Sequence, residues 1–174
     1  MFYPINTLNK LKSIGSLKIE FRELTNGFCV FTTLRIPAHY PIYQAKDTLI
    51  FQNQTYQTVQ VDEQTHLLDF VFANMNHSCN PSTFIDCGSL TIFAERDLEP
   101  GDELTFFYPS TEWRMERPFK CRCGASGCIG NVKGAAKVLS SSLNRYRLNR
   151  HIERLRNTIL TREKTASCAK ILNS

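Results

Sequence analysis

The feature that most constrains folding is the stretch CRCGASGC at residues 121–128, where three cysteines follow the spacing C-x-C-x4-C. Cysteines so close together, with glycines beside them, are typical of a metal site rather than of a packed core. A structural zinc ion takes four ligands in tetrahedral geometry, so another part of the chain must supply the fourth. The alternative is three buried thiols without metal. The spacing alone leaves the fourth ligand open.

The number of cysteines also favours metal binding. Seven cysteines, an odd number, fit metal binding in a reducing compartment better than a set of disulfides. The 174 residues, 42% hydrophobic and 21% charged, predict one soluble globular domain that needs no metal to build a core. No apolar run is long enough to cross a bilayer, so we expect no membrane partner. The first residues lack the features of a signal peptide, which predicts an intracellular protein, cytoplasmic or nuclear, and leaves open signal-free delivery into a host cell.

Positive charge gathers at the C-terminal end. Residues 133–174 hold ten Lys and Arg against two Glu, so this segment carries +8 and the remainder −3. Apolar residues recur at helical spacing and predict a helix near residues 136–164, with the stripe Leu148, Ile152, Leu155 and Ile159. Three interpretations stay open. They are a helix packed on the domain with solvated arginines, contact with nucleic acid or a nucleosome, and a homodimer or partner helix.

Short strands separated by turns fill most of the chain before this helix. Alternating and β-rich stretches predict strands at 17–24, 27–34, within 41–51, at 55–61, 89–95 and 102–108. Residues 66–72 fit a strand or a short helix. The first fifteen residues are weakly patterned and predict a loose arm. The fold class that follows is mainly β.

Two further motifs precede the cysteine stretch. NHSCNP at 76–81 ends at a proline and is a poor strand but a good binding loop. GDELTFFY at 101–108 places a tyrosine at a strand end, from which its hydroxyl can enter a pocket. With these three motifs in this order, the chain resembles the SET-domain protein-lysine methyltransferases, and in particular compact single-domain members with a zinc-binding post-SET segment. The resemblance covers about residues 17–130.

The resemblance implies a SET-domain (β-clip) fold of several small twisted sheets with a pseudoknot, a zinc-binding post-SET segment and a C-terminal helix. The expected parts are an N-terminal arm (1–15), a SET domain (16–109), a post-SET zinc segment (110–132) and a basic C-terminal helix and tail (133–174). It also implies the missing ligand. A structural zinc ion would be held by Cys79, Cys121, Cys123 and Cys128, and would clamp the post-SET segment onto the loop that bears Asn76 and His77.

The activity implied is transfer of a methyl group from S-adenosylmethionine to a lysine side chain of a protein, with histone tails as the leading substrate class. Tyr108 matches the active-site tyrosine, which orients the amine. The cofactor contacts implied are Gly27, Phe28, Asn76, His77, Tyr108, Phe119 and Trp113; for Phe119 and Trp113, plain packing is the alternative. Phe106 falls at a position where phenylalanine leaves room for di- or trimethylation. Tyr56 or Tyr43 would supply a second pocket aromatic.

The sequence departs from the family at several points. Cys29 replaces the second glycine of a G-x-G, and Phe107 replaces an aspartate that is usually outward-facing or in a structural hydrogen bond. Two other classes of function therefore stay open. One is a non-catalytic, zinc-stabilised binding module with the same fold. The other is a nucleic-acid- or chromatin-binding protein that acts through its basic C-terminal helix.

Overall fold

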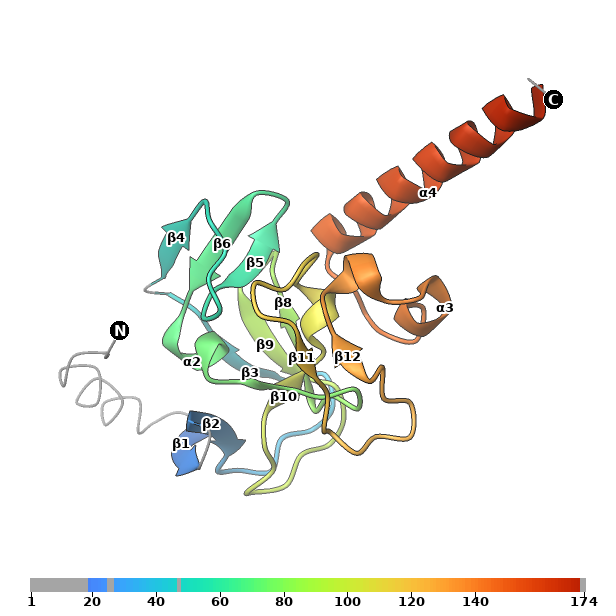
Figure 1. Ribbon diagram of the computed structural model, residues 1–174. Coiled ribbons are helices and arrows are strands. Elements are labelled where there is room, and N and C mark those ends of the chain that lie inside the picture. Colours follow the sequence, from blue (N-terminus) through green and yellow to red (C-terminus); the bar gives the residue numbers. More distant parts are fainter. Residues whose placement is uncertain (1–18, 25–26, 47, 173–174) are drawn as a thin grey trace.

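A computed structural model describes residues 19–24, 27–46 and 48–172, apart from the side chains of Leu24 and of residues 162–172 (Figure 1). The strands are β1 (Ile19–Leu24), β2 (Gly27–Thr32), β3 (Pro41–Gln44), β4 (Leu49–Phe51), β5 (Val59–Asp62), β6 (Thr65–Leu68), β7 (Asn76–His77), β8 (Thr83–Asp86), β9 (Thr91–Ala94), β10 (Thr105–Phe106), β11 (Phe119–Lys120) and β12 (Asn131–Val132). The helices are α2 (Phe70–Ala73), η1 (Tyr108–Ser110), η2 (Ala135–Lys137), α3 (Ser140–Leu143) and α4 (Arg150–Leu172). The expected arm at residues 1–15 lies outside the described residues.

The strands form several small sheets, as the sequence predicted. Their orders are β1-β2, β3-β9-β8, β4-β6-β5, β7-β10 and β11-β12. Only β7 and β10 pair in parallel among the pairs of the described strands. None of these sheets is large enough to bury a core alone, so the fold depends on packing between sheets.

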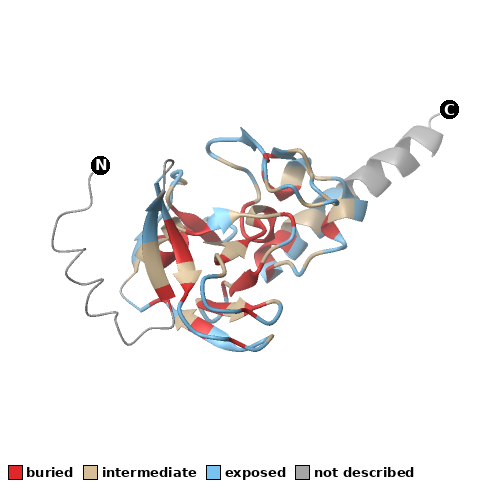
Figure 2. Ribbon diagram, turned by 90° about the horizontal axis from the view of Figure 1, so that it is seen from below, coloured by how far each residue is buried: buried red, intermediate tan, exposed pale blue. Residues whose placement is uncertain are grey.

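Two hydrophobic clusters hold the sheets together, and Figure 2 shows buried residues gathered inside the body. The larger cluster, the β core, is built from the strands and includes Val30, Ile36, Phe72, Ile85, Ile92, Leu98 and Leu104. The smaller one, the C-terminal cluster, contains Cys79, Phe107, Cys121, Val132, Ala135, Leu143 and Ile152. The second cluster therefore joins the cysteine stretch to the C-terminal helices.

Local hydrogen bonds explain where the strands differ from prediction. Residues 41–51 hold two strands rather than one. The strand expected at 55–61 begins only at Val59, because the backbone N–H of Thr55 donates to Oγ1 of Thr58 at 2.9 Å and closes a turn. Residues 66–72 hold both predicted alternatives, since Asp69 ends β6 and caps α2 by accepting from two backbone N–H groups.

Strand β8 was not predicted, and the strand expected at 102–108 is only two residues long. Two polar residues, Ser82 and Thr83, follow Pro81 and are typical of a loop, yet Ile85 of β8 pairs with Ile92 of β9 in the β core. The strand expected at 102–108 is β10, which stops at Phe106 because Tyr108–Ser110, just beyond it, form the 3-10 helix η1. Tyr108 therefore stands just beyond a strand end.

The prediction of one helix from about residue 136 was wrong, because α4 begins at Arg150. The side chain of Asn149 binds backbone groups of the β domain, so the chain before it does not continue the helix. Its side-chain oxygen accepts from the N–H of Cys87 at 2.9 Å, and its amide donates to the carbonyls of Ile85 (2.9 Å) and Ser110 (3.0 Å). The carbonyl of Asn149 then accepts the first helical hydrogen bond, from Glu153. Figure 1 shows α4 projecting from the body beyond this anchor.

This anchor divides the predicted apolar stripe. Leu148 precedes α4 and packs against the C-terminal cluster, where Ile152 is fully buried, whereas Ile159 is exposed. Arg154 is paired with Asp62 and Glu63 at 2.8 and 3.1 Å. The start of α4 is therefore a packed helix. Within the described part of the chain, no helix combines the length and apolar character needed to span a membrane.

Candidate active site and metal centre

The two polar motifs meet where β7 and β10 run side by side. Thr105 pairs with Asn76, and Phe106 pairs with His77. The backbone N–H of Ser78 extends the contact by donating to the carbonyl of Phe106 at 3.1 Å. Parallel pairing of segments so far apart in sequence places the NHSC loop beside the end of the aromatic strand. The threading that defines a pseudoknot stays a prediction.

Tyr108 is held at both its backbone and its hydroxyl. The hydroxyl donates to the carbonyl of Met75 at 2.8 Å, and the ring centroid lies 4.7 Å from that of Phe106. Burial, followed by the charge of Glu112, raises the pKa of the Tyr108 phenol. The hydroxyl therefore stays protonated at neutral pH, so it can orient a neighbouring group but is not available as a base.

His77 lies between Tyr108 and the cysteines. Its Nδ1 accepts from the backbone N–H of Tyr108 at 3.2 Å, so the ring proton of the neutral imidazole sits on Nε2, which is 3.3 Å from Sγ of Cys79. Burial lowers the pKa of His77 to about 4, which keeps the ring neutral. One imidazole thus connects the tyrosine backbone with the cysteine site.

The structure brings together the four cysteines that the resemblance implied. The sulfur atoms of Cys79, Cys121, Cys123 and Cys128 all lie within 4.8 Å of one another. Sγ of Cys79 is 3.9 Å from that of Cys121 and 4.0 Å from that of Cys128. A tetrahedron with Zn–S bonds of about 2.3 Å has edges of about 3.8 Å, so the separations fit a shared metal ion.

The surroundings of the sulfurs also fit a metal. The backbone N–H of Ile129 points to Sγ of Cys79 at 3.5 Å, and that of Gly130 points to Sγ of Cys128 at 3.4 Å. Such donors stabilise thiolates. Gly124 and Gly130 have φ values of 71° and 72°, which favour glycine and let the chain turn around the site. Burial raises the pKa of the Cys79 and Cys121 thiols, so a bound cation would be what ionises them.

Most of the residues implied for a cofactor lie near this junction. The side-chain amide of Asn76 donates to Sγ of Cys29 (3.0 Å) and to the carboxylate of Glu103 (2.7 Å), which ties β7 to β2. Gly27 begins β2 with a φ of 122°. Phe119 is 39% exposed, and its ring centroid lies 6.0 Å from those of His77 and Tyr108. Phe28 is equally exposed.

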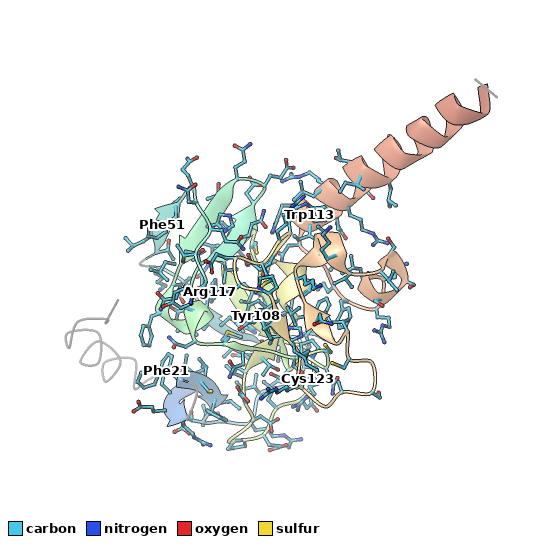
Figure 3. All side chains as sticks on the ribbon, in the orientation of Figure 1. Phe21, Phe51, Tyr108, Trp113, Arg117 and Cys123 are labelled. Atoms are coloured by element: carbon cyan, nitrogen blue, oxygen red, sulfur yellow. The ribbon has the colours of Figure 1, made fainter. Side chains whose placement is uncertain are left out.

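Two candidates lie elsewhere. Trp113 packs against the C-terminal cluster, and its backbone N–H donates to the side chain of Gln60 at 2.8 Å; Figure 3 shows Trp113 away from Tyr108. Tyr43 donates its hydroxyl to Asp69 at 2.8 Å and packs edge-on against Phe72. Neither residue lines the cavity in front of Tyr108. Of the two tyrosines considered for that cavity, Tyr56 is the one that lines it.

The cavity in front of Tyr108 has a volume of about 290 Å³. Aromatic rings form much of its wall, namely Tyr56, Phe72, Phe106, Tyr108 and Phe119. At its rim the guanidinium of Arg117 lies 4.3 Å from the ring centroid of Tyr56. An aromatic cavity of this size suits a long aliphatic chain that ends in a cation.

A family model described as "SET domain" matches residues 27–109, which include β7, β10 and Tyr108. This part of the chain is a SET domain.

Relatives support this assignment. The SET-domain chain is 43% identical to "Methyltransferase flvH" of Aspergillus flavus over 107 residues, 59% of each protein. It is 40% identical to a histone-lysine N-methyltransferase, H3 lysine-36 specific, of Aspergillus oryzae over 69 residues, 36% of this chain and 7% of that protein. The chain thus covers about three-fifths of the first relative and a small part of the second.

A solved structure agrees on the fold. KRYPTONITE, in complex with mCHG DNA and SAH, superposes with a TM-score of 0.52 at 21% identity, covering 66% of this chain and 29% of that one. At this identity the likeness shows the SET fold alone. The fold class predicted from the motifs is therefore confirmed.

Two features of the site were not predicted. Phe107, which replaces the usual aspartate, is buried and stacks on Tyr146 with centroids 3.6 Å apart. Tyr146 also donates its hydroxyl to the carbonyl of Cys79 at 2.9 Å, so the segment before α4 is fastened to the cysteine loop. The second feature is Glu112, a buried carboxyl that lines the aromatic cavity.

Proposed function

We propose that the protein is an S-adenosylmethionine-dependent methyltransferase that acts on the lysine amine of a protein or peptide. The observation that carries the proposal is the placement of Tyr108. Its hydroxyl is fixed on the Met75 carbonyl beside an aromatic cavity, and its backbone is fixed on His77 of the NHSC loop. The names of the relatives, a methyltransferase and histone-lysine methyltransferases, support the same reaction class.

The residues around β7 fit the cofactor. Asn76, next to His77, is exposed, and Phe119 places an exposed ring with its centroid 6.0 Å from that of His77. Gly27 has no other atom within 4 Å of where a side chain would start, so a ligand can approach its backbone. These residues, with Phe28, would hold S-adenosylmethionine, which supplies the methyl group. Trp113, in the C-terminal cluster, is a weaker candidate for this contact.

The remaining residues would position the substrate. A lysine chain enters between the aromatic walls, which exclude water, and its nitrogen is oriented by the Tyr108 hydroxyl and nearby backbone carbonyls. Phe106 carries no hydroxyl that would fill the space beside the nitrogen. We therefore propose that di- or trimethylated products form.

The four cysteines would hold a structural zinc ion. A site of four thiolates has no open position for water or substrate, so its role is to fix the post-SET segment. That segment carries Phe119, and its cysteine site touches His77 through Cys79. The zinc site would thereby complete the cofactor site.

Histone tails are the leading substrate class, because several relatives are histone-lysine methyltransferases. A nuclear location would follow from that substrate. Contact with nucleic acid through α4 and dimerisation stay predictions; Arg150 is exposed, but Arg154 is already paired within the chain.

The proposal is tested by transfer of radiolabelled methyl groups from S-adenosylmethionine to a histone mixture. Wild-type protein should label at least one histone, and Tyr108→Phe should not label it above background. If the two proteins give equal background labelling across histones and other lysine-rich proteins, the chain is a zinc-stabilised binding module instead.

A further inference from the structure

Glu112 is a buried acid at the wall of the aromatic cavity. It follows η1 and lines the cavity together with Phe106 and Tyr108, yet only 5% of its surface is exposed. The other acid that lines the cavity, Glu116, is exposed. A carboxyl taken out of water at this depth needs either good partners or a function.

The hydrogen bonds of Glu112 leave part of one oxygen available. Oε1 accepts from the backbone N–H of Gln60 at 2.8 Å and lies 3.2 Å from the hydroxyl of Thr111. Oε2 accepts from the side chain of Gln54 at 2.9 Å, which is its one bond among the described residues. A carboxylate oxygen can accept two, so Oε2 retains room for one more donor.

The substrate chemistry supplies such a donor. A lysine amine in water is almost entirely ammonium at neutral pH, because its pKa is about 10.4. The ammonium has no lone pair and cannot attack a methyl group. A site that methylates amines therefore gains from a group that first attracts the cation and then takes a proton from it.

We propose that Glu112 is the residue that receives the substrate ammonium in the cavity and takes its proton. In this step one N–H bond of the ammonium breaks, its electron pair stays on nitrogen, and the proton forms an O–H bond with Oε2. The neutral amine is then free to be oriented by Tyr108. The inference rests on the proposed function of the same cavity and adds the group that makes the amine reactive.

The surroundings of Glu112 suit this exchange. Burial raises its pKa to about 7, although hydrogen bonds from Gln60, Thr111 and Gln54 lower it. Both protonation states are then accessible near neutral pH. The other titratable or charged groups around it are Tyr108 on η1, Cys87 after β8, His151 on α4 through the Thr111 carbonyl, and Glu116 and Arg117 at the rim. Burial keeps Cys87 a neutral thiol and lowers the pKa of His151.

Binding of a simple cation tests the first half of the proposal without methyl transfer. The probe is n-butylammonium, with butan-1-ol as its neutral match, followed by NMR shifts of the cavity aromatics. Glu112→Gln should weaken n-butylammonium binding roughly tenfold or more, since a hydrogen bond to a charged group is lost, and leave butan-1-ol binding within about twofold. Equal n-butylammonium affinity in both proteins would overturn the proposal.

The pH dependence of kcat/KM for a lysine peptide tests the proton step. Wild-type protein should give a bell with an acid limb near the Glu112 pKa of about 7. Glu112→Gln should lose that limb. Its kcat/KM should instead rise about tenfold per pH unit, because the fraction of free lysine amine rises with pH. Glu99→Gln, which removes an equal charge from an exposed pair with Arg35, should keep the wild-type profile.

A milder variant guards against misfolding. Gln54→Ala removes the donor to Oε2, so the Glu112 pKa rises and the acid limb should move to higher pH. An unchanged acid limb in Glu112→Gln or Gln54→Ala would overturn the role of Glu112 while the methyltransferase stands. Methyl transfer absent from wild type, with n-butylammonium binding still dependent on Glu112, would overturn the proposed function but keep Glu112 as the cation site.

Discussion

His77 accepts a hydrogen bond from the backbone N–H of Tyr108 at 3.2 Å, and the opposite nitrogen of its ring lies 3.3 Å from Sγ of Cys79. The half-buried ring cannot turn without losing both contacts. The position of the Tyr108 backbone is therefore coupled to the cysteine site. This coupling gives zinc a role in activity beyond holding the last segment in place.

Removing the metal should impair function before it unfolds the protein. Cys121→Ser should lose bound zinc, S-adenosylmethionine affinity and activity, while amides of the β core stay protected from hydrogen exchange. The reason is that Cys121 belongs to the C-terminal cluster, separate from the β core. Cys87→Ser, a buried cysteine outside the site, should keep one zinc ion per chain. Loss of β-core protection together with zinc would show that the metal supports the whole fold.

Removing the Tyr108 hydroxyl should separate catalysis from folding. Tyr108→Phe should lower kcat by about 100-fold or more, as expected when a hydroxyl that orients the reacting amine is lost. The free energy of unfolding should fall by only about 1 kcal/mol, because one hydrogen bond to Met75 is lost and the ring still packs on Phe106. Denaturant titration measures this change in the free energy of unfolding. A loss of several kcal/mol would make the hydroxyl structural.

Phe106 should set the number of methyl groups added. The Phe106 ring has its centroid 4.7 Å from that of Tyr108, so Phe106→Tyr should add a hydroxyl in this region and restrict the product to monomethyl-lysine. Mass spectrometry of a peptide after long incubation distinguishes the products. Monomethyl-lysine as the sole wild-type product would contradict the assignment of Phe106.

Asn149 should anchor the C-terminal helix. Asn149→Ala leaves the buried N–H of Cys87 and the carbonyls of Ile85 and Ser110 with fewer partners, which should cost about 2–3 kcal/mol of unfolding free energy. Asn144→Ala is the matched control, since Asn144 is exposed and contacts Arg156. Equal stability of the two variants in thermal unfolding would mean that α4 is held by other contacts.

Glu112 should make stability depend on pH. Its pKa of about 7 when folded exceeds the ordinary 4.5, so the folded state keeps a proton that the unfolded state has lost between these values. Stability from this group should therefore fall as pH rises from about 4.5 to 7, by on the order of 3 kcal/mol. Glu112→Gln should show a flatter dependence over that range. A parallel dependence in both proteins would show that the Glu112 pKa is near its ordinary value.

The motifs predicted the cysteine cluster better than periodicity predicted the bounds of the strands and helices. The resemblance named all four clustered cysteines, because ligand spacing and motif order survive in sequence. It missed the Phe107–Tyr146 stack, since that contact depends on a segment outside the resemblance. Glu112 carries no local signal: an acid between a threonine and a tryptophan is unremarkable until folding buries it.

The predicted bounds of helices and strands were wrong where side chains bind backbone groups that are distant in the sequence. The apolar stripe predicted a longer helix, but Asn149 binds Cys87 and Ile85 and so ends the preceding segment. A short-range pattern holds no information about such partners. Strand β8 was missed for a related reason, because its pairing with β9, rather than its own composition, makes it a strand.

The most direct test of the account is methylation of an array of lysine peptides with S-adenosylmethionine, read by mass spectrometry. Wild-type protein should add methyl groups to the lysine side chain of at least one peptide, and the same peptide with arginine in place of that lysine should stay unmodified. Tyr108→Phe should leave both unmodified. Methyl addition that persists in Tyr108→Phe, or occurs on the arginine peptide, would contradict the assignment of this cavity to lysine methylation.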